Sequence, residues 1–163
     1  MNTLSIYQDK RAALKQKYLG ENANSSSFDS AGTGGIDHLA MIASDIERTI
    51  EFYTNILGMR VSRIVQNRDE PTSTHVFLDM GGGNLLAFFD FPELGKDPTT
   101  RGIGAMHHVA LKGTTEQYNA VIHNLKSNDI AFSIHDDEDA SSVYFRDPDN
   151  ILLEVRTRHR DGQ

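Results

Sequence analysis

The chain has 163 residues, enough for one domain with a sizeable core or for two small repeated modules. A net charge of −7 argues against a nucleic-acid partner and against an anionic membrane surface, because both require a basic footprint. Cysteine is absent, which excludes disulfides, thiolate metal sites and cysteine nucleophiles. No apolar run is long enough to cross a membrane and no signal peptide is recognisable, so the chain is expected to be cytoplasmic. Any metal must then be held by His, Asp or Glu.

Residues 1–35 are expected to form an N-terminal helical arm followed by a flexible linker. A weak apolar stripe predicts a helix over 3–19, and the Ser-, Asn- and Gly-rich stretch 20–35 predicts the linker. This arm carries no recognisable chemistry.

Residues 36–91 predict a strand, a helix and three further strands. The first strand is expected at 36–43, and Ser44 or Asp45 fits the N-cap of a helix that ends before Gly58. The remaining strands are expected at 59–66, 74–80 and 85–91.

The same order of elements returns in residues 106–158. The motif His38-Leu39-Ala40-Met41 aligns with His108-Val109-Ala110-Leu111, and each opens a strand followed by a helical pattern. Duplication of a βαβββ unit explains both halves. We therefore expect an α+β fold in which two paired βαβββ modules, 36–91 and 106–158, form a curved, partly closed mixed sheet around a metal-binding cleft.

A predicted hairpin near the C-terminus contains one conspicuous carboxylate. The sequence Asp147-Pro148-Asp149-Asn150 is typical of a tight turn, and 143–145 and 151–155 read as the strands on either side. Glu154 interrupts the apolar second strand, where a carboxylate is costly unless a cation or strong donors meet it. The alternative is a strand-end glutamate that leans into solvent.

Strand alternation assigns the polar residues to faces of the predicted sheets. Five of them share the face expected to line the cleft: His38, His108, His135, Tyr144 and Glu154. Two further histidines, His75 and His107, are assigned to the helix side. Two imidazoles and one carboxylate suit a first-row divalent metal with open positions, as in the facial triad of non-haem Fe(II). The alternative for each single histidine is an ordinary core or strand-edge residue.

With these features the chain resembles the vicinal oxygen chelate superfamily, which includes glyoxalases, type I extradiol dioxygenases, fosfomycin-resistance transferases and bleomycin-binding proteins. The resemblance covers 36–158, and three motifs carry it: Asp37-His38-Leu39, Phe52-Tyr53…Leu57-Gly58-Met59 and Tyr144-Phe145-Arg146-Asp147-Pro148-Asp149. It implies the paired βαβββ fold and implies that the metal ligands are His38, His108 and Glu154.

Within the superfamily the sequence is most similar to the extradiol branch. The signature of that branch begins with a His, has a Tyr before the Asp-Pro turn and ends at the metal-binding Glu, which His135, Tyr144 and Glu154 match in order. The resemblance implies that His135 and Tyr144 are catalytic residues that hydrogen-bond the substrate or bound oxygen. A further catalytic His of that branch has no match in 91–106, and the remaining candidates for its role are Glu93, His107 and His75.

The expected function is therefore that of a metal-dependent enzyme, an extradiol-type ring-cleaving dioxygenase acting on a small catechol-like molecule with adjacent oxygens. Fe(II) is the expected ion, with Mn, Zn and Ni as alternatives. Phe88, aligned by the repeat with Glu154, cannot serve as a fourth ligand and is expected to line the cleft with Leu86 and Leu152. The alternatives are a non-redox transferase, lyase or isomerase of the fosfomycin-resistance or glyoxalase type, and a small-molecule-binding resistance protein. Neither nucleic acid nor membrane is an expected partner, and homo-oligomerisation stays open.

Overall fold

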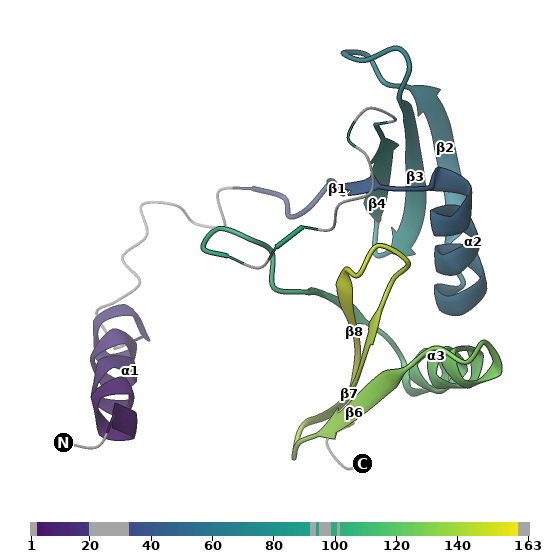
Figure 1. The fold of residues 1–163 in the computed structure, drawn as a ribbon. Helices are drawn as coiled ribbons and strands as arrows, with labels where there is room; N and C mark the ends of the chain where they lie inside the picture. Colours follow the sequence, from purple (N-terminus) through teal and green to yellow (C-terminus); the bar gives the residue numbers. More distant parts are fainter. Residues whose placement is uncertain (1–2, 20–32, 92–93, 95–98, 101, 160–163) are drawn as a thin grey trace. The chain divides into compact units, whose positions relative to one another are not determined.

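The computed structural model of the chain describes residues 3–19, 33–91, 94, 99–100 and 102–159 (Figure 1). The chain divides into two compact units, 1–35 and 36–163. The first contains helix α1 (Thr3–Leu19), as predicted, and most of the predicted linker lies outside the described residues. Among the described residues, no helix is both long enough and apolar enough to span a membrane.

The second unit begins with a βαβββ module. Its elements are β1 (His38–Ala43), α2 (Ile46–Leu57), β2 (Arg60–Gln66), β3 (Thr74–Gly81) and β4 (Asn84–Asp90). The sheet order is β1-β4-β3-β2, so β1 pairs in parallel with β4 while the other neighbours are antiparallel.

The second module repeats this topology. Its elements are β5 (Val109–Lys112), α3 (Thr115–Ser127), β6 (Phe132–Asp136), β7 (Ala140–Arg146) and β8 (Leu152–Arg158). The sheet order is β5-β8-β7-β6, with β5 parallel to β8. The predicted duplication and α+β fold are confirmed, and the strands form two separate four-stranded sheets rather than a closed barrel (Figure 1).

Local side-chain chemistry explains where the helices and the last turn begin and end. Asp45 caps α2 by accepting the N–H of Arg48, and Gly58 ends the helix with a left-handed φ of 67°. In the hairpin turn, the Asp147 carboxylate accepts the backbone N–H groups of Asp149 and Ile151, and Asn150 adopts the left-handed φ of 68° that the turn requires.

The core lies on the helix side of both sheets, and this corrects one prediction. Phe88 is 1 % exposed and its ring centroid is 4.9 Å from that of Tyr53 on α2, while Leu86 is fully buried on the same side of β4. Neither residue therefore lines the face that carries His38. The third residue predicted to line the cleft is Leu152, in the second sheet. It does lie on the same face of that sheet as Glu154, because the two residues are two positions apart on β8.

Contacts from the last turn hold the two modules together. The hydroxyl of Tyr53 donates to the buried carboxylate of Asp147 over 3.1 Å, and Ser44 donates through its backbone N–H to Asp149 over 2.9 Å. Arg48 forms an ion pair with Asp149 at 3.1 Å. The Asp-Pro-Asp turn thus joins its own module to α2, which gives these carboxylates a structural role.

Asp147 makes the stability of this junction sensitive to pH. Burial raises the pKa of Asp147 to about 6 from its ordinary 3.8, against the opposing effect of hydrogen bonds from Ile151, Tyr53 and Asp149. The folded state therefore favours the protonated form, so the contribution of Asp147 is fully present below pH 3.8 and is lost as the pH rises through about 6. The loss is roughly 3 kcal/mol in the free energy of unfolding.

We expect this loss to appear as a difference between the native protein and Asp147→Asn in urea unfolding at several pH values. The variant carries no titrating group at this position, so the native protein should lose stability relative to it between about pH 4 and pH 7. Parallel stability curves for the two proteins would contradict the assignment.

Candidate metal centre

Two of the three predicted ligands meet on the second sheet. Glu154 lies in β8 opposite Ala110 of β5, and His108 immediately precedes β5. The distance from His108 Nε2 to Glu154 Oε2 is 2.9 Å. Glu154 is 4 % exposed, so the prediction that its carboxylate meets strong partners in a buried strand is confirmed, and the solvent-exposed alternative is wrong.

A network of polar side chains holds the Glu154 carboxylate in position. Ser142 of β7 donates to Glu154 Oε1 over 2.6 Å, and Arg156 donates to the Ser142 hydroxyl over 3.2 Å while pairing with Asp137 at 2.9 Å. Burial alone would raise the pKa of Glu154, yet hydrogen bonds from Ser142 and Tyr144 and the charge of His108 outweigh it and lower the pKa. The site therefore keeps an ionised carboxylate, the state that a metal ion requires.

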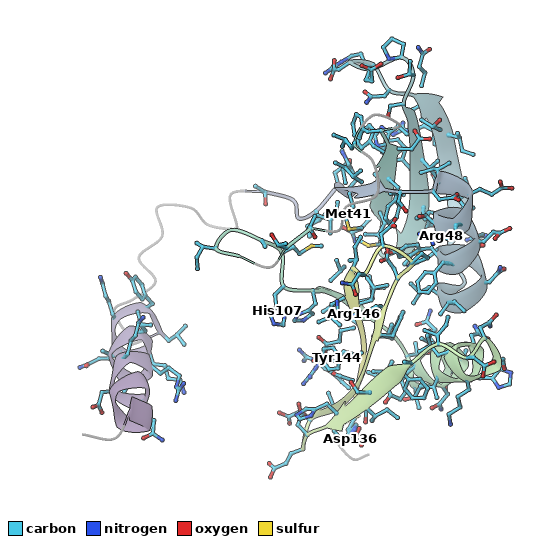
Figure 2. All side chains as sticks on the ribbon, in the orientation of Figure 1. Met41, Arg48, His107, Asp136, Tyr144 and Arg146 are labelled. Atoms are coloured by element: carbon cyan, nitrogen blue, oxygen red, sulfur yellow. The ribbon has the colours of Figure 1, made fainter. Side chains whose placement is uncertain are left out.

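Both predicted catalytic residues lie on the same face of this sheet. Tyr144 is the cross-strand partner of Glu154, and its ring centroid is 5.9 Å from that of His108. Figure 2 shows Tyr144 and His107 on the side of the sheet away from α3. His135 of β6 pairs with Ser142, which places the exposed imidazole beside the residue that supports Glu154.

His38 lies on the other sheet, in β1, with a different set of neighbours. Its Nδ1 lies 2.6 Å from Asp37 Oδ1, which leaves Nε2 available as a ligand. Its ring centroid is 5.7 Å from Phe77 and 6.5 Å from His75. His75 therefore shares the face of His38, and the prediction that it points toward the helix is wrong.

His107 also departs from its predicted orientation. Its Nδ1 lies 2.6 Å from Nδ1 of His108, so it contacts a candidate ligand instead of packing under a helix.

Burial lowers the pKa of His75, and the charges of His38 and Arg63 lower it further, which favours the neutral imidazole. Glu93, the third candidate for the missing catalytic role, lies outside the described residues.

The structure does not bring all three predicted ligands together within one chain. Among the described residues, no group of three His, Asp or Glu side chains converges on a common point. In the first sheet the residue matching Glu154 is Ala87, because Ala40 pairs with Ala87 as Ala110 pairs with Glu154. The predicted match with Phe88 is displaced by one residue, but alanine, like phenylalanine, supplies no ligand.

The His108 and Glu154 pair fits a divalent ion. Two ligand atoms bound at right angles to a first-row metal, each about 2.1 Å from it, are separated by about 3 Å. The 2.9 Å between the imidazole nitrogen and the carboxylate oxygen matches that separation. Such a site would have two protein ligands from one chain and open positions for others.

The supporting residues Ser142, Arg156 and Asp137 were missed by sequence reasoning. Strand alternation carries a signal for two of them, because Ser142 of β7 and Arg156 of β8 both lie on the same face of the sheet as Glu154. Asp137 follows β6 in a loop, where alternation gives no information.

Among known proteins, the chain is similar to enzymes of more than one reaction type. It is 28 % identical over 81 residues to the putative ring-cleaving dioxygenase MhqA of Bacillus subtilis, a match that covers 48 % of this chain and 25 % of that protein. It is 30 % identical over 103 residues to human mitochondrial methylmalonyl-CoA epimerase, covering 60 % of this chain and 55 % of that protein. The chain thus spans a quarter to about half of the length of these relatives.

Solved structures show the same fold at low sequence identity. The glyoxylase/bleomycin resistance protein/dioxygenase domain from Frankia sp. EAN1pec matches with a TM-score of 0.71 and 18 % identity, covering 80 % of this chain and 96 % of that one. The fosfomycin resistance protein FosX of Listeria monocytogenes, solved in complex with Mn(II) and a sulfate ion, matches with a TM-score of 0.59 and 19 % identity, covering 79 % and 96 %.

A family model matches residues 35–155, which include the first βαβββ module, the second module as far as the middle of β8, and every predicted site residue. The duplicated fold and the family match agree. The chain belongs to the glyoxalase/bleomycin resistance protein/dioxygenase superfamily.

Proposed function

We propose that this protein is an extradiol-type ring-cleaving dioxygenase that acts on a small catechol-like substrate through a divalent metal, with Fe(II) as the working ion. The observation that carries the proposal is the contact between His108 Nε2 and Glu154 Oε2 with Tyr144 beside both groups. The similarity to a putative ring-cleaving dioxygenase supports the choice of reaction.

In this proposal His38, His108 and Glu154 hold the ion, which supplies Lewis-acid and redox chemistry when bound. The reaction breaks a ring carbon–carbon bond next to the hydroxylated carbons, and both atoms of O₂ enter the product. Burial and the Glu154 carboxylate raise the pKa of Tyr144, so this phenol stays protonated. Its one O–H is donated to Glu154, and its oxygen can accept a hydrogen bond from a substrate hydroxyl. His135, exposed on the same face, exchanges protons with the substrate or with water.

We also propose that a second copy of the chain completes the site. One chain brings together two ligands, and His38 lies on the opposite sheet with its Nε2 free of a partner in the described part of the chain. In a two-fold dimer the contacts are reciprocal, so the first sheet of each copy can supply His38 to the second sheet of the other. On the face of His38, Ile42 and Val65 are 52 % and 39 % exposed, and such a partner would cover them.

A non-redox transferase or isomerase is the second candidate. The similarities to methylmalonyl-CoA epimerase and to FosX favour it, and the same ligand set would serve an ion that polarises a substrate oxygen. Against a site with four protein ligands stands Ala87, which occupies the place of a fourth.

The decisive experiment loads the metal-free protein with Fe(II) under argon and then admits air and a panel of catechols. We expect O₂ uptake matched by formation of a yellow ring-opened product, with both activities lost in Glu154→Gln. Flat O₂ consumption across the panel by protein that does bind Fe(II) would overturn the dioxygenase proposal and favour the non-redox reaction.

A further inference from the structure

Arg63, on the edge strand β2, is the feature of the first sheet that the proposed chemistry does not use. Its guanidinium carbon lies 3.9 Å from the centroid of the Phe77 ring, and Phe77 is only 4 % exposed because neighbouring side chains cover it. Phe77 in turn packs against His38, with ring centroids 5.7 Å apart. Stacking thus fixes a permanent cation on the sheet face that presents a candidate metal ligand.

The donors of this guanidinium are available to a ligand. A cation–π contact uses the face of the group and leaves its N–H donors free, and Arg63 is exposed with no ion pair in the described part of the chain. Three other arginines are paired: Arg48 with Asp149, Arg68 with Asp69 and Arg156 with Asp137. An unpaired, stacked arginine stands out in a chain with a net charge of −7.

Aromatic rings extend from Arg63 along the same face. His75 stacks on Phe89 with centroids 3.7 Å apart, and Phe89 stacks on Phe91 at 5.8 Å. These three rings are half-buried, so part of their surface is open to a flat ligand. The Nε2 atom of His75 is buried and has no hydrogen-bond partner among the described residues. Besides the guanidinium of Arg63, this face therefore carries a second polar group without a protein partner, next to His38.

From this arrangement we infer that Arg63 binds a carboxylate on the substrate, so that the substrate is an aromatic acid carrying its adjacent oxygens elsewhere on the ring. A guanidinium binds a carboxylate in a two-pronged pair, and the row of rings accepts the planar body of the same molecule. This inference rests on the proposed function for the placement of the oxygens at the metal. The recognition of the carboxylate depends only on residues of the first sheet.

The test measures binding to the metal-free protein, so that it does not depend on the reaction. Protocatechuate, a catechol with a ring carboxylate, is compared by titration calorimetry with protocatechuamide, its neutral isostere. We expect the native protein to bind the acid about tenfold more tightly than the amide, as a charge-assisted contact would provide. Arg63→Gln should bind both equally, with its affinity for the amide unchanged.

Two further variants define the contact. Arg63→Lys keeps the charge without the planar fork and should retain only part of the preference. Lys126→Gln removes an exposed positive charge at the end of α3 and should leave the preference for the acid over the amide intact. This control distinguishes a local contact with Arg63 from the effect of the protein's net charge. Equal affinities in the native protein, or an unchanged ratio in Arg63→Gln, would overturn the inference. A preserved preference in a protein that cleaves no catechol would sink the dioxygenase proposal and leave the role of Arg63 standing.

Discussion

Replacing Glu154 with Gln is expected to weaken the binding of Mn(II) or Fe(II) about a hundredfold, equivalent to ~2.8 kcal/mol. The native carboxylate is ionised, because hydrogen bonds from Ser142 and Tyr144 and the nearby His108 lower its pKa in spite of burial. An amide of the same shape can still accept from the Ser142 hydroxyl. It carries no charge, however, and is a poorer ligand for a divalent ion.

The measurement is a metal titration of protein first stripped with a chelator, together with unfolding in the presence and absence of Mn(II). A bound ion stabilises the folded state by RT ln(1 + [L]/Kd), where [L] is the free ion concentration. At a Mn(II) concentration between the two Kd values, the ion should raise the Tm of the native protein and not that of Glu154→Gln. In chelator the variant should be somewhat less stable than the native protein, because Glu154→Gln removes the charge that His108, Ser142 and Tyr144 favour. The comparison is therefore the change in Tm that Mn(II) produces in each protein.

Glu138→Gln is the matched control, because Glu138 is an exposed residue between β6 and β7 and the substitution makes the same change in charge. It should bind metal as the native protein does. Equal metal content in Glu154→Gln and the native protein would refute the site on the second sheet.

The sequence is most informative where local chemistry decides the structure. The Asp, Pro and Asn residues at 147–150 predict the turn, and Asn150 does take the left-handed conformation. In the C-terminal hairpin, Val143 and Phe145 on one strand and Leu153 and Val155 on the other mark the buried face, so the pattern assigns Tyr144 and Glu154 to the opposite face. A shared face, together with the predicted turn at 147–150, is enough to predict that these two side chains are neighbours.

Alternation fails on β3 for a physical reason. The run Val76-Phe77-Leu78 is apolar on both faces of the strand, so alternation does not show which face is buried under the helix. The prediction for His75 had no support from this strand and placed the residue on the wrong face. A related error displaces the repeat by one residue at Phe88, and a shift of one residue exchanges the two faces of a strand. The Gly-rich turn at 81–83 and the irregular register near Gly81 hide the true match with Ala87.

The separation of His38 from its proposed partners could not be predicted from strand patterns at all. It depends on how the two modules pack, which is governed by contacts between distant residues. The amide of Asn124 on α3 donates to the backbone carbonyl of Ile56 on α2, and Tyr53 bonds to Asp147. Each of these residues is ordinary in its own segment, and only the assembled fold shows that helix packing joins the modules.

Mixing two inactive variants should therefore restore function, provided that each site draws ligands from two chains. His38→Ala and Glu154→Gln each destroy every site in their own homodimers. In a mixed dimer, one site takes His38 from the Glu154→Gln chain and Glu154 from the His38→Ala chain, so it is intact. The other site combines both defects. Random pairing gives half mixed dimers, so we expect about a quarter of the native metal content and activity.

The reciprocal control pairs the native chain with the double variant that carries both substitutions. If ligands come from two chains, every site in that mixed dimer lacks one ligand and the purified species is inactive. If instead one chain supplies all three ligands, the opposite results are expected. The mixed dimer of the two single variants is then inactive, and the dimer of the native chain with the double variant keeps one working site. Co-expression with two affinity tags isolates each mixed dimer, and a strictly monomeric protein in sedimentation would refute the shared site. The two pairings contain the same substitutions in the same numbers, so only the division of ligands between chains can make them differ.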